Sequence, residues 1–370
     1  MKKGYVLFTM VILTFVLFGC NIGTESSPND EFVNPYRIEA RCVYHLPKNG
    51  VCTECGNAVT ESQGLEFTLS EDGRSYVCSG IGTCMDTQIV IPEQYEGKQV
   101  SSIGDRAFDD CDKIKSVVLP NSVESIGTEA FRSCRKCEHF QIPDTVQSIG
   151  NGAFKHCTQM KEFRLPSSIQ EIPEAMFEGC FRLKKVFMTE TVMEIGPRAF
   201  YNCQSLESIS LPPYLTKIGS NAFYQCLQLH ELVLPHSIQT IGQSAFEKST
   251  NIYEVIYSGS LTEWMKIEFG YKGNPMTVCE RVWIGGEQLS ETVVIPDAVT
   301  VLKDYCFDGN KTIQNIVVHS GISPINVSSK AFVRCPALTD LYIKTTEEQV
   351  NAFKKTIRFE GRIHFVTEGD

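Results

Sequence analysis

Four possible metal ligands lie close together near the amino terminus: Cys42, His45, Cys52 and Cys55. They form a C-x-x-H pair and a C-x-x-C pair that are separated by six residues. Two such pairs are the usual means of supplying nitrogen and sulfur ligands to a tetrahedral zinc ion. We therefore predict structural zinc within residues 39–60, with disulfides or unpaired thiols as the alternatives. A thioredoxin-like role for Cys52 and Cys55 is disfavoured, because no βαβ pattern surrounds them.

A second group of cysteines recurs every 23 residues, and such a row of thiols suggests metal or redox chemistry: Cys111, Cys134, Cys157, Cys180, Cys203 and Cys226. On neighbouring strands, equivalent Cβ atoms would lie about 4.8 Å apart, beyond the ~3.5–4.5 Å of a disulfide. Free Cys is also a small, readily buried residue. We therefore predict buried packing thiols. Cys137 forms a C-x-x-C with Cys134, but it takes the place of Met160 and Leu183 in later repeats, so we interpret it as a core residue.

The sequence contains no recognisable catalytic arrangement. None of the seven His residues stands in an HExxH motif, and no nucleophile elbow or phosphate-binding loop is present. The net charge is -10, and the Lys and Arg residues are scattered along the chain. Phosphate binding needs clustered basic residues, so the sequence argues against nucleic acid as a partner. We predict that the protein is not an enzyme.

The elements that must position these residues are repeats of 23 residues between Asp105 and Ile256. Their most regular position is Phe108, Phe131, Phe154, Phe177, Phe200, Phe223 and Phe246. Ile stands five residues before each Phe, and Gly follows that Ile except at Pro173. After the Cys, an L-x-x-L-x-L pattern predicts a short strand, which a proline usually closes. No single repeat can bury its apolar face, so we predict a solenoid in which neighbouring coils supply the core.

These repeats resemble the leucine-rich repeats of the BspA-like, or Treponema-type, bacterial surface proteins, over about residues 64–366. The resemblance implies a curved leucine-rich repeat solenoid with parallel β-strands on its inner face, in 23-residue coils, over residues 64–258. SGSLTEWMKI looks like an insertion found in that family, within residues 259–290. Terminal repeats, then a closing helix and strand, are expected in residues 291–368. Cys78 and Cys84 could pair in the opening coil.

The first residues carry the marks of export. Two lysines precede an uncharged apolar run from Val6 to Phe18, which is short for a membrane span and predicts a signal peptide in residues 1–20. Gly19 and Cys20, with Leu17 ahead of them, resemble a bacterial lipobox, which implies a lipid on Cys20. Residues 21–38 suit a flexible tether. We expect a lipid-anchored protein at the cell surface; ordinary cleavage or an uncleaved anchor are the alternatives.

Two residues of each predicted strand point away from the core and vary between repeats. The first column contains Ser116, His139, Glu162, Lys185, Ser208, Glu231 and Glu254, and the second contains Val118, Gln141, Arg164, Phe187, Ser210, Val233 and Ile256. Such variation suits a binding surface, although a merely solvated face would vary too. Apolar residues in the second column favour binding, and Phe187 beside Arg164 is the predicted hot spot. The opposite face and the loop around Trp264 are the other possible sites.

Export, anchor and solenoid together predict a non-catalytic surface module. The family resemblance implies a protein partner on a host or on a neighbouring bacterium, with the membrane contacted through the lipid alone. Two alternatives stay open. One is a structural envelope protein without a specific ligand. The other is a periplasmic metal-handling protein that uses the Cys42 to Cys55 cluster.

Overall fold

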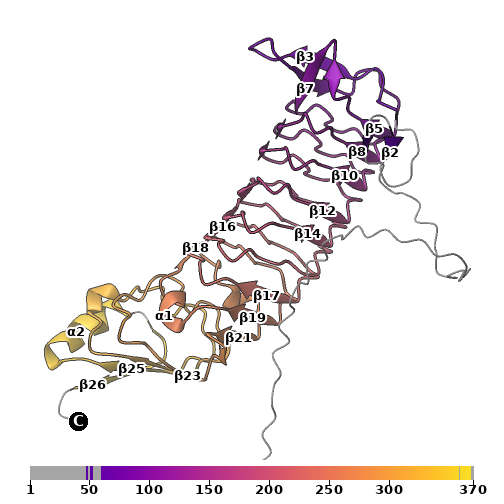
Figure 1. Ribbon diagram of the computed structural model, residues 1–370. Coiled ribbons are helices and arrows are strands. Elements are labelled where there is room, and N and C mark those ends of the chain that lie inside the picture. Colours follow the sequence, from indigo (N-terminus) through magenta and orange to yellow (C-terminus); the bar gives the residue numbers. More distant parts are fainter. Residues whose placement is uncertain (1–46, 49–50, 53–59, 358, 368–370) are drawn as a thin grey trace, which may run out of the picture. The chain divides into compact units, whose positions relative to one another are not determined.

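Coils of chain stack on one another through parallel β-pairing. The computed structural model describes residues 47–48, 51–52, 60–357 and 359–367, all within the unit Tyr44–Asp370. Figure 1 shows two sets of strands on opposite sides of the coils. We call the set that follows the recurring cysteine the front ladder and the set that contains the recurring isoleucine the rear ladder. The predicted solenoid of repeated coils is confirmed.

The front ladder displays alternate residues outward. Its strands are β5 (Gln88–Val90), β8 (Ser116–Val118), β10 (His139–Gln141), β12 (Glu162–Arg164), β14 (Lys185–Phe187), β17 (Glu231–Leu234), β19 (Glu254–Tyr257) and β21 (Arg281–Ile284). Paired strands are in register at a spacing of one coil, as Phe163 is with Val186. In β12 and β14 the middle residue is buried and its two neighbours are exposed. The front therefore presents two residues from each of these strands.

The rear ladder aligns the recurring isoleucines. Its strands are β7 (Lys98–Ile103), β9 (Ser125–Ile126), β11 (Ser148–Ile149), β13 (Glu171–Ile172), β15 (Glu194–Ile195), β16 (Lys217–Ile218), β18 (Thr240–Ile241) and β20 (Glu268–Phe269). At its start lie β3 (Glu66–Leu69), β4 (Tyr76–Gly80) and β6 (Gln94–Tyr95), while β1 (Pro47–Lys48) and β2 (Val51–Cys52) form a separate antiparallel pair. The ladder is interrupted between β11 and β13. There Pro173 replaces a glycine, and without an N–H it cannot donate to Ile149 as Gly150 does to Ile126 (2.8 Å).

Tight turns connect the rear strands to the recurring cysteine. Each regular coil has two residues with left-handed backbone on either side of its recurring Phe and the residue before it, which is Ala except at Met176; Arg198 (φ 56°) and Asn202 (φ 60°) are examples. The Phe N–H donates to the Ala carbonyl of the next coil, as Phe177 does to Ala199 at 2.8 Å. The turns thus form a third set of hydrogen bonds between coils.

The recurring phenylalanines are the spine of the core. The rings of Phe108, Phe131, Phe154, Phe177, Phe200, Phe223 and Phe246 are 0% exposed. Neighbouring rings stack with centroids 5.1–6.1 Å apart. Each burial contributes about 1.5–3 kcal/mol, and each aromatic pair roughly 0.5–1.5 kcal/mol more. Because each ring packs on rings of adjacent coils, no coil is stable by itself.

One front coil differs from the prediction. We expected a short strand around Ser208 and Ser210, and none is formed there. The small serine side chains offer little cross-strand contact, which is the unit of sheet stabilisation. A second proline, Pro213, also fixes the backbone just beyond this segment. The front ladder is interrupted here, between β14 and β17, and it is also interrupted between β10 and β12.

The segment expected to be an insertion, residues 259–290, forms one longer coil. After β19 comes helix α1 (Leu261–Trp264), whose N-cap Ser260 forms a capping box with Glu263. The chain then adds β20 to β18 at the rear, passes through the 3-10 helix η1 (Pro275–Thr277), and adds β21 to β19 at the front. The coil therefore keeps its place in both ladders despite its extra length.

A second sheet completes the fold. Beyond β21 the antiparallel strand β22 (Glu287–Gln288) ends the front ladder, and a new parallel sheet contains β23 (Thr292–Val294), β24 (Asn315–Val318), β25 (Asp340–Lys344) and β26 (Arg362–Val366). The buried Trp264 donates its indole N–H to the carbonyl of Cys306 (3.1 Å). Buried Asn274 donates to the carbonyls of Tyr305 and Cys306, both at 3.0 Å. These side chains join the longer coil to the next one. Helix α2 (Glu347–Thr356), which packs on η2 (Pro324–Asn326), and β26 are the expected closing helix and strand.

Candidate binding surface

The row of cysteines packs and satisfies the backbone. All six ladder thiols are free, and only Cys111 is partly exposed. The Cys134 thiol donates to the Phe108 carbonyl of the preceding coil at 3.1 Å, and Ser249 makes the same bond to Phe223 at 2.6 Å. Burial raises the pKa of these thiols, that of Cys180 to about 12. Protonated, buried thiols are neither nucleophiles nor metal ligands.

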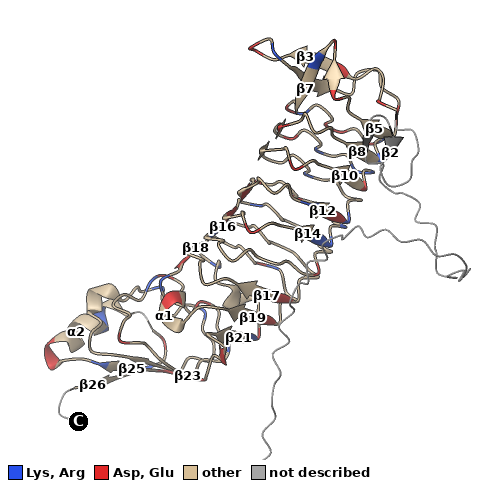
Figure 2. Ribbon diagram, in the orientation of Figure 1, with Lys and Arg blue, Asp and Glu red and all other residues tan. Residues whose placement is uncertain are grey.

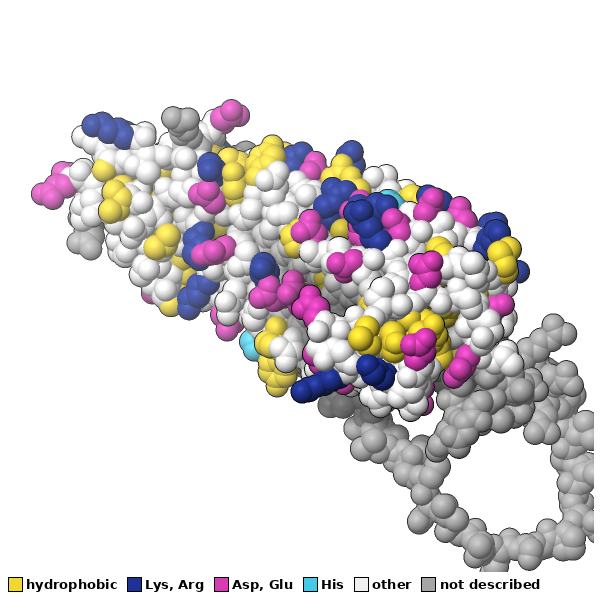
Figure 3. Space-filling model, turned by 90° about the horizontal axis from the view of Figure 1, so that it is seen from above, with side chains coloured by type: hydrophobic (Ala, Val, Ile, Leu, Met, Phe, Trp, Pro, Cys, Tyr) yellow, Lys and Arg dark blue, Asp and Glu magenta, His cyan; other side chains and the backbone are white. Residues whose placement is uncertain are grey.

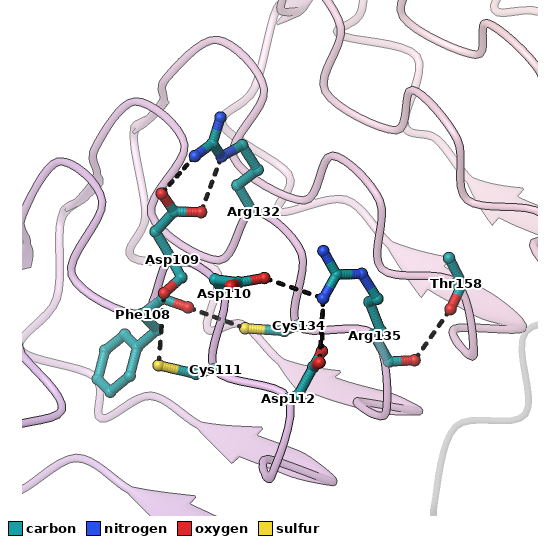
Figure 4. Close-up of polar contacts among 9 residues, drawn as sticks. All are labelled: Phe108, Asp109, Asp110, Cys111, Asp112, Arg132, Cys134, Arg135 and Thr158. Atoms are coloured by element: carbon teal, nitrogen blue, oxygen red, sulfur yellow. Dashed lines mark hydrogen bonds and ion pairs between the residues drawn. The ribbon is translucent and has the colours of Figure 1, made fainter.

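The partly exposed Cys111 lies in an acidic surrounding, shown in Figure 4. Arg132 of the next coil makes two hydrogen bonds to Asp109 (2.7 and 2.6 Å) and holds the pKa of that carboxyl below its usual range. Arg135 pairs with Asp112 at 3.0 Å. Burial raises the pKa of the Cys111 thiol. The cluster is therefore a set of ion pairs between coils, and nowhere in the described ranges do three or more His, Cys, Asp or Glu residues form a metal-binding group.

The predicted columns lie on the front, and their central members are the most accessible. Those classed as exposed are Glu162, Arg164, Lys185, Phe187, Ser208, Ser210, Glu231 and Val233, whereas Ser116, His139, Gln141, Glu254 and Ile256 are half-buried. Burial lowers the pKa of His139, so its imidazole favours the neutral form. The accessible part of the surface thus spans β12 to β17.

The prediction is wrong for one residue of the second column. Val118 was expected to be exposed but is buried, at 8%. It lies in register between Val90 of β5 and Gln141 of β10, whose side chains occupy the same face and are themselves half-buried. Flanked on both sides, Val118 belongs with the core and offers no contact to a partner.

Arg164 and Phe187 lie side by side at the centre of the front. They are register partners on β12 and β14, and the guanidinium carbon is 5.5 Å from the ring centroid. Phe187 is 44% exposed. Cation–π contacts at exposed sites contribute about 0.5–1 kcal/mol and hold both groups in a fixed arrangement. Glu162 and Lys185 face each other on the same strands. We call these four residues the central patch.

A second group of front residues includes the half-buried Trp283, which the sequence analysis missed. Trp283 of β21 pairs with Ile256 of β19, and its indole N–H donates to Glu254 at 2.8 Å. Val233, 43% exposed, lies on the adjacent strand β17. The signal was the alternation of Val282, Trp283 and Ile284, which buries both neighbours of the tryptophan. The extra length of the coil in residues 259–290 made it impossible to align Trp283 with the front columns by the 23-residue spacing.

Charges of both signs accompany these groups. Figure 3 shows acidic and basic side chains interspersed over the face that it displays, with no field of a single sign. Lys161 pairs with Glu138 (3.3 Å) and Lys184 with Glu207 (2.7 Å) beside the first column. On the front itself, the first column carries Glu162, Lys185 and Glu231, so this face is suited to a partner of mixed charge.

Other predicted sites fall elsewhere. Cys20, Cys42, His45, Cys55 and the side chain of Cys52 lie outside the described residues, so the lipid and zinc assignments stay predictions. Trp264 is 0% exposed, which excludes its ring as part of the alternative loop site.

Two further features concern the predicted opening coil and the membrane. Cys78 and Cys84, which could have paired, are free and buried. In the part of the chain that is described, no helix has the length and apolar character needed to cross a membrane.

Parallel coils of 23 residues, most with a short front strand and each regular one with a buried Phe, define a leucine-rich-repeat solenoid. The chain belongs to the BspA-type leucine-rich-repeat family. Residues 83–203, 172–274 and 286–361 match the family described as "BspA type Leucine rich repeat region", with six copies. That membership indicates a binding or scaffold role rather than an enzymatic one.

Several solved structures are similar. A leucine rich cell surface protein from Faecalibacterium prausnitzii has 20% identity and a TM-score of 0.41, covering 80% of this chain and 97% of that one. A leucine-rich repeat protein from Bacteroides ovatus has 17% identity and a TM-score of 0.39, covering 84% and 100%. The pneumococcal vaccine antigen PcpA has 15% identity and a TM-score of 0.45, covering 84% and 98%. No curated protein matches the chain.

Proposed function

We propose that the protein is a non-catalytic surface module that binds a protein partner through the front of its solenoid. The observation that carries this proposal is the exposed Phe187 ring with Arg164 against it, on a strand pair that is otherwise polar. Aromatic and Arg side chains dominate the binding energy of protein interfaces. The buried columns repeat one residue type, whereas the front columns vary from coil to coil. Such variation suits a surface selected for a partner.

The proposal is tested by comparing two double variants. The first, Arg164→Ala with Phe187→Ala, removes the centre of the front. The second, Met193→Ala with Lys217→Ala, removes an exposed apolar residue and a cation at the rear and is the matched control. The probes are purified host extracellular-matrix proteins and intact cells of neighbouring bacteria. We expect binding to fall at least tenfold in the front variant only, with melting temperatures unchanged because exposed substitutions cost roughly 0.5 kcal/mol or less.

The opposite result, loss of binding in the rear variant alone, would move the site to the other face. If no probe binds the wild-type chain, and deletion of the protein instead alters the cell envelope, the scaffold role is the better description. These outcomes separate the two classes of function.

We further propose that the chain is exported and held on a bacterial membrane by a lipid on Cys20. The apolar run from Val6 to Phe18 and the lipobox-like residues around Cys20 support this. Cells grown with labelled palmitate should incorporate label into the wild-type chain and none into Cys20→Ala. Protease added to intact cells should degrade the protein if it lies at the surface. A labelled Cys20→Ala chain would contradict the anchor.

We also propose that Cys42, His45, Cys52 and Cys55 hold one structural zinc ion, on the strength of their spacing. Elemental analysis of chain purified without chelator should find one zinc per chain. Cys42→Ser should release the metal while the repeats keep their melting temperature, because solenoid coils contact only their neighbours. Two disulfides and no zinc in the wild-type chain would rule the site out.

A further inference from the structure

The charges of the front ladder reverse sign across the coil that lacks a strand. Lys185 lies on β14, one coil before Ser208, and Glu231 lies on β17, one coil after it, all in the first column. Figure 2 shows blue ribbon at β14 and red ribbon near β17. In the second column, Phe187 and Val233 flank Ser210 in the same way and are 44% and 43% exposed. The front is thus arranged symmetrically about the two serines, with opposite charges and matched apolar groups.

These two charges differ from those beside them. Lys184 is paired with Glu207 at 2.7 Å within the chain. Among the residues that the structure describes, neither Lys185 nor Glu231 has a partner within ion-pair distance. Lys185 has Glu162 beside it in register and lies near Glu207, but neither it nor Glu231 is held in an ion pair within the described chain, so both can pair with groups outside the molecule.

A two-fold axis converts this arrangement into self-complementarity. If the axis lies parallel to the strands and passes over Ser208 and Ser210, it reverses the order of coils in a second copy. Lys185 then lies opposite Glu231 of the other copy, and Phe187 opposite Val233 of the other copy. Each contact occurs twice, as in any isologous interface. The serines on the axis allow close approach because their side chains are small.

We propose that the partner of the front face is a second copy of this chain, bound face to face through Lys185–Glu231 and Phe187–Val233 contacts. This inference rests on the proposed function and names its partner. One pairing in the same arrangement, Glu162 with Glu254 of the other copy, joins two carboxylates. Its cost is reduced because Glu254 already accepts a hydrogen bond from Trp283.

The association is expected to be weak for a single pair of molecules. The strands from β12 to β19 span only about 20 Å at the usual ~4.8 Å spacing. Interfaces that bury less than roughly 1,000 Å² are transient. Many copies on two facing surfaces would bind together by avidity, which raises the effective affinity by about 10²–10⁴. A multivalent assay is therefore the appropriate test.

The test uses the full chain attached through its carboxyl terminus to fluorescent beads of two colours. Wild-type beads should aggregate. Lys185→Glu beads and Glu231→Lys beads should each aggregate at least tenfold less, because like charges then face each other at both contacts. Mixing the two variants should restore aggregation between the colours, since the glutamate introduced in one variant then faces the lysine introduced in the other. The matched controls are Lys217→Glu and Glu194→Lys, which reverse charges at the rear and should aggregate like the wild type.

Rescue by the mixture cannot come from misfolding, because each variant would have to be folded to complement the other. Failure of wild-type beads to aggregate, unchanged aggregation of both single variants, or a mixture that stays dispersed would each overturn the inference. If in that case a matrix protein binds the wild-type chain and not the Arg164→Ala, Phe187→Ala variant, the proposed function stands and only the identity of the partner is wrong.

Discussion

The regular coils between Ile103 and Phe246 and the irregular segment that follows are held together in different ways. In the regular coils one residue type, placed once per coil, makes the same contact throughout: Phe stacks on Phe, and Cys donates to the Phe carbonyl of the preceding coil. In the irregular segment single residues make contacts that occur once, such as Trp264 and Asn274 with Cys306. A contact that repeats in every coil can be predicted from the sequence pattern. Where each contact occurs only once, the fold depends on individual side chains.

The largest effect should come from breaking the Phe column in the middle. Phe177 is 0% exposed and stacks on both neighbouring rings, whereas Phe332 is 8% exposed and near the end of the array. We expect Phe177→Ala to cost about 3–5 kcal/mol and to separate two poorly coupled halves in denaturant melts. Phe332→Ala should mainly fray the carboxyl-terminal coils. Equal loss of cooperativity in the two variants would contradict a stability that passes only between neighbouring coils.

The next effect tests a unique contact. Asn274→Ala removes the donor for two buried carbonyls and the cap of η1, where Asn274 accepts from Met276 N–H at 2.9 Å. A buried polar group left without its partner costs about 1–3 kcal/mol. Hydrogen exchange should show faster opening of β23 to β26 with little change before Phe246. The control is Asn251→Ala, because Asn251 is exposed and bonds a single carbonyl. Faster exchange throughout the array would mean that the junction is not a local contact.

The difference between repeated and unique contacts also decides which parts of the fold and of the binding surface the sequence predicts. The Phe, Ile and Cys positions indicated the coils and their register, because each prediction was repeated seven or six times in the sequence. The strand at Ser208–Ser210 was predicted wrongly, since the pattern of buried residues says nothing about cross-strand contacts on the outer side. Trp283 was missed because the longer coil shifted its register. The exposure of Val118 was predicted wrongly, because its side chain is covered by side chains of the two neighbouring coils, which the pattern within one repeat does not include.

Two aspartates of the irregular segment should respond to pH in opposite directions. Burial raises the pKa of Asp308, against the effect of Arg334, while hydrogen bonds from Ser328 and Lys330 lower the pKa of Asp304. A carboxyl with a raised folded pKa contributes stability below its unfolded pKa and loses it as pH rises through the folded pKa. One with a depressed pKa contributes above the unfolded pKa and loses that contribution as pH falls.

Melting temperatures of Asp308→Asn and Asp304→Asn measure this directly. As pH rises above about 4, the ordinary carboxyl pKa, the wild type should lose stability relative to Asp308→Asn. Below about pH 4, as Asp304 becomes protonated, the wild type should lose stability relative to Asp304→Asn. Parallel curves for the wild type and Asp308→Asn would show that Arg334 fully offsets the effect of burial, and a gain of wild-type stability over the same pH range would show that it outweighs burial.

The smallest effect concerns the Cys column, where the chain contains its own control. At Ser249 a hydroxyl donates to the Phe223 carbonyl at 2.6 Å, as the thiol of Cys180 does to the Phe154 carbonyl at 3.2 Å. Cys180→Ser keeps a donor at this position, so we expect it to change the free energy of unfolding by less than about 1 kcal/mol. Cys180→Ala removes the donor and leaves a small gap, and it should cost about 1–2 kcal/mol. Urea melts of the two variants decide whether the hydrogen bond or the volume of sulfur is what the column requires. If Ser is the more harmful substitution, the thiols serve mainly as apolar packing, and the bond to the carbonyl contributes little to stability.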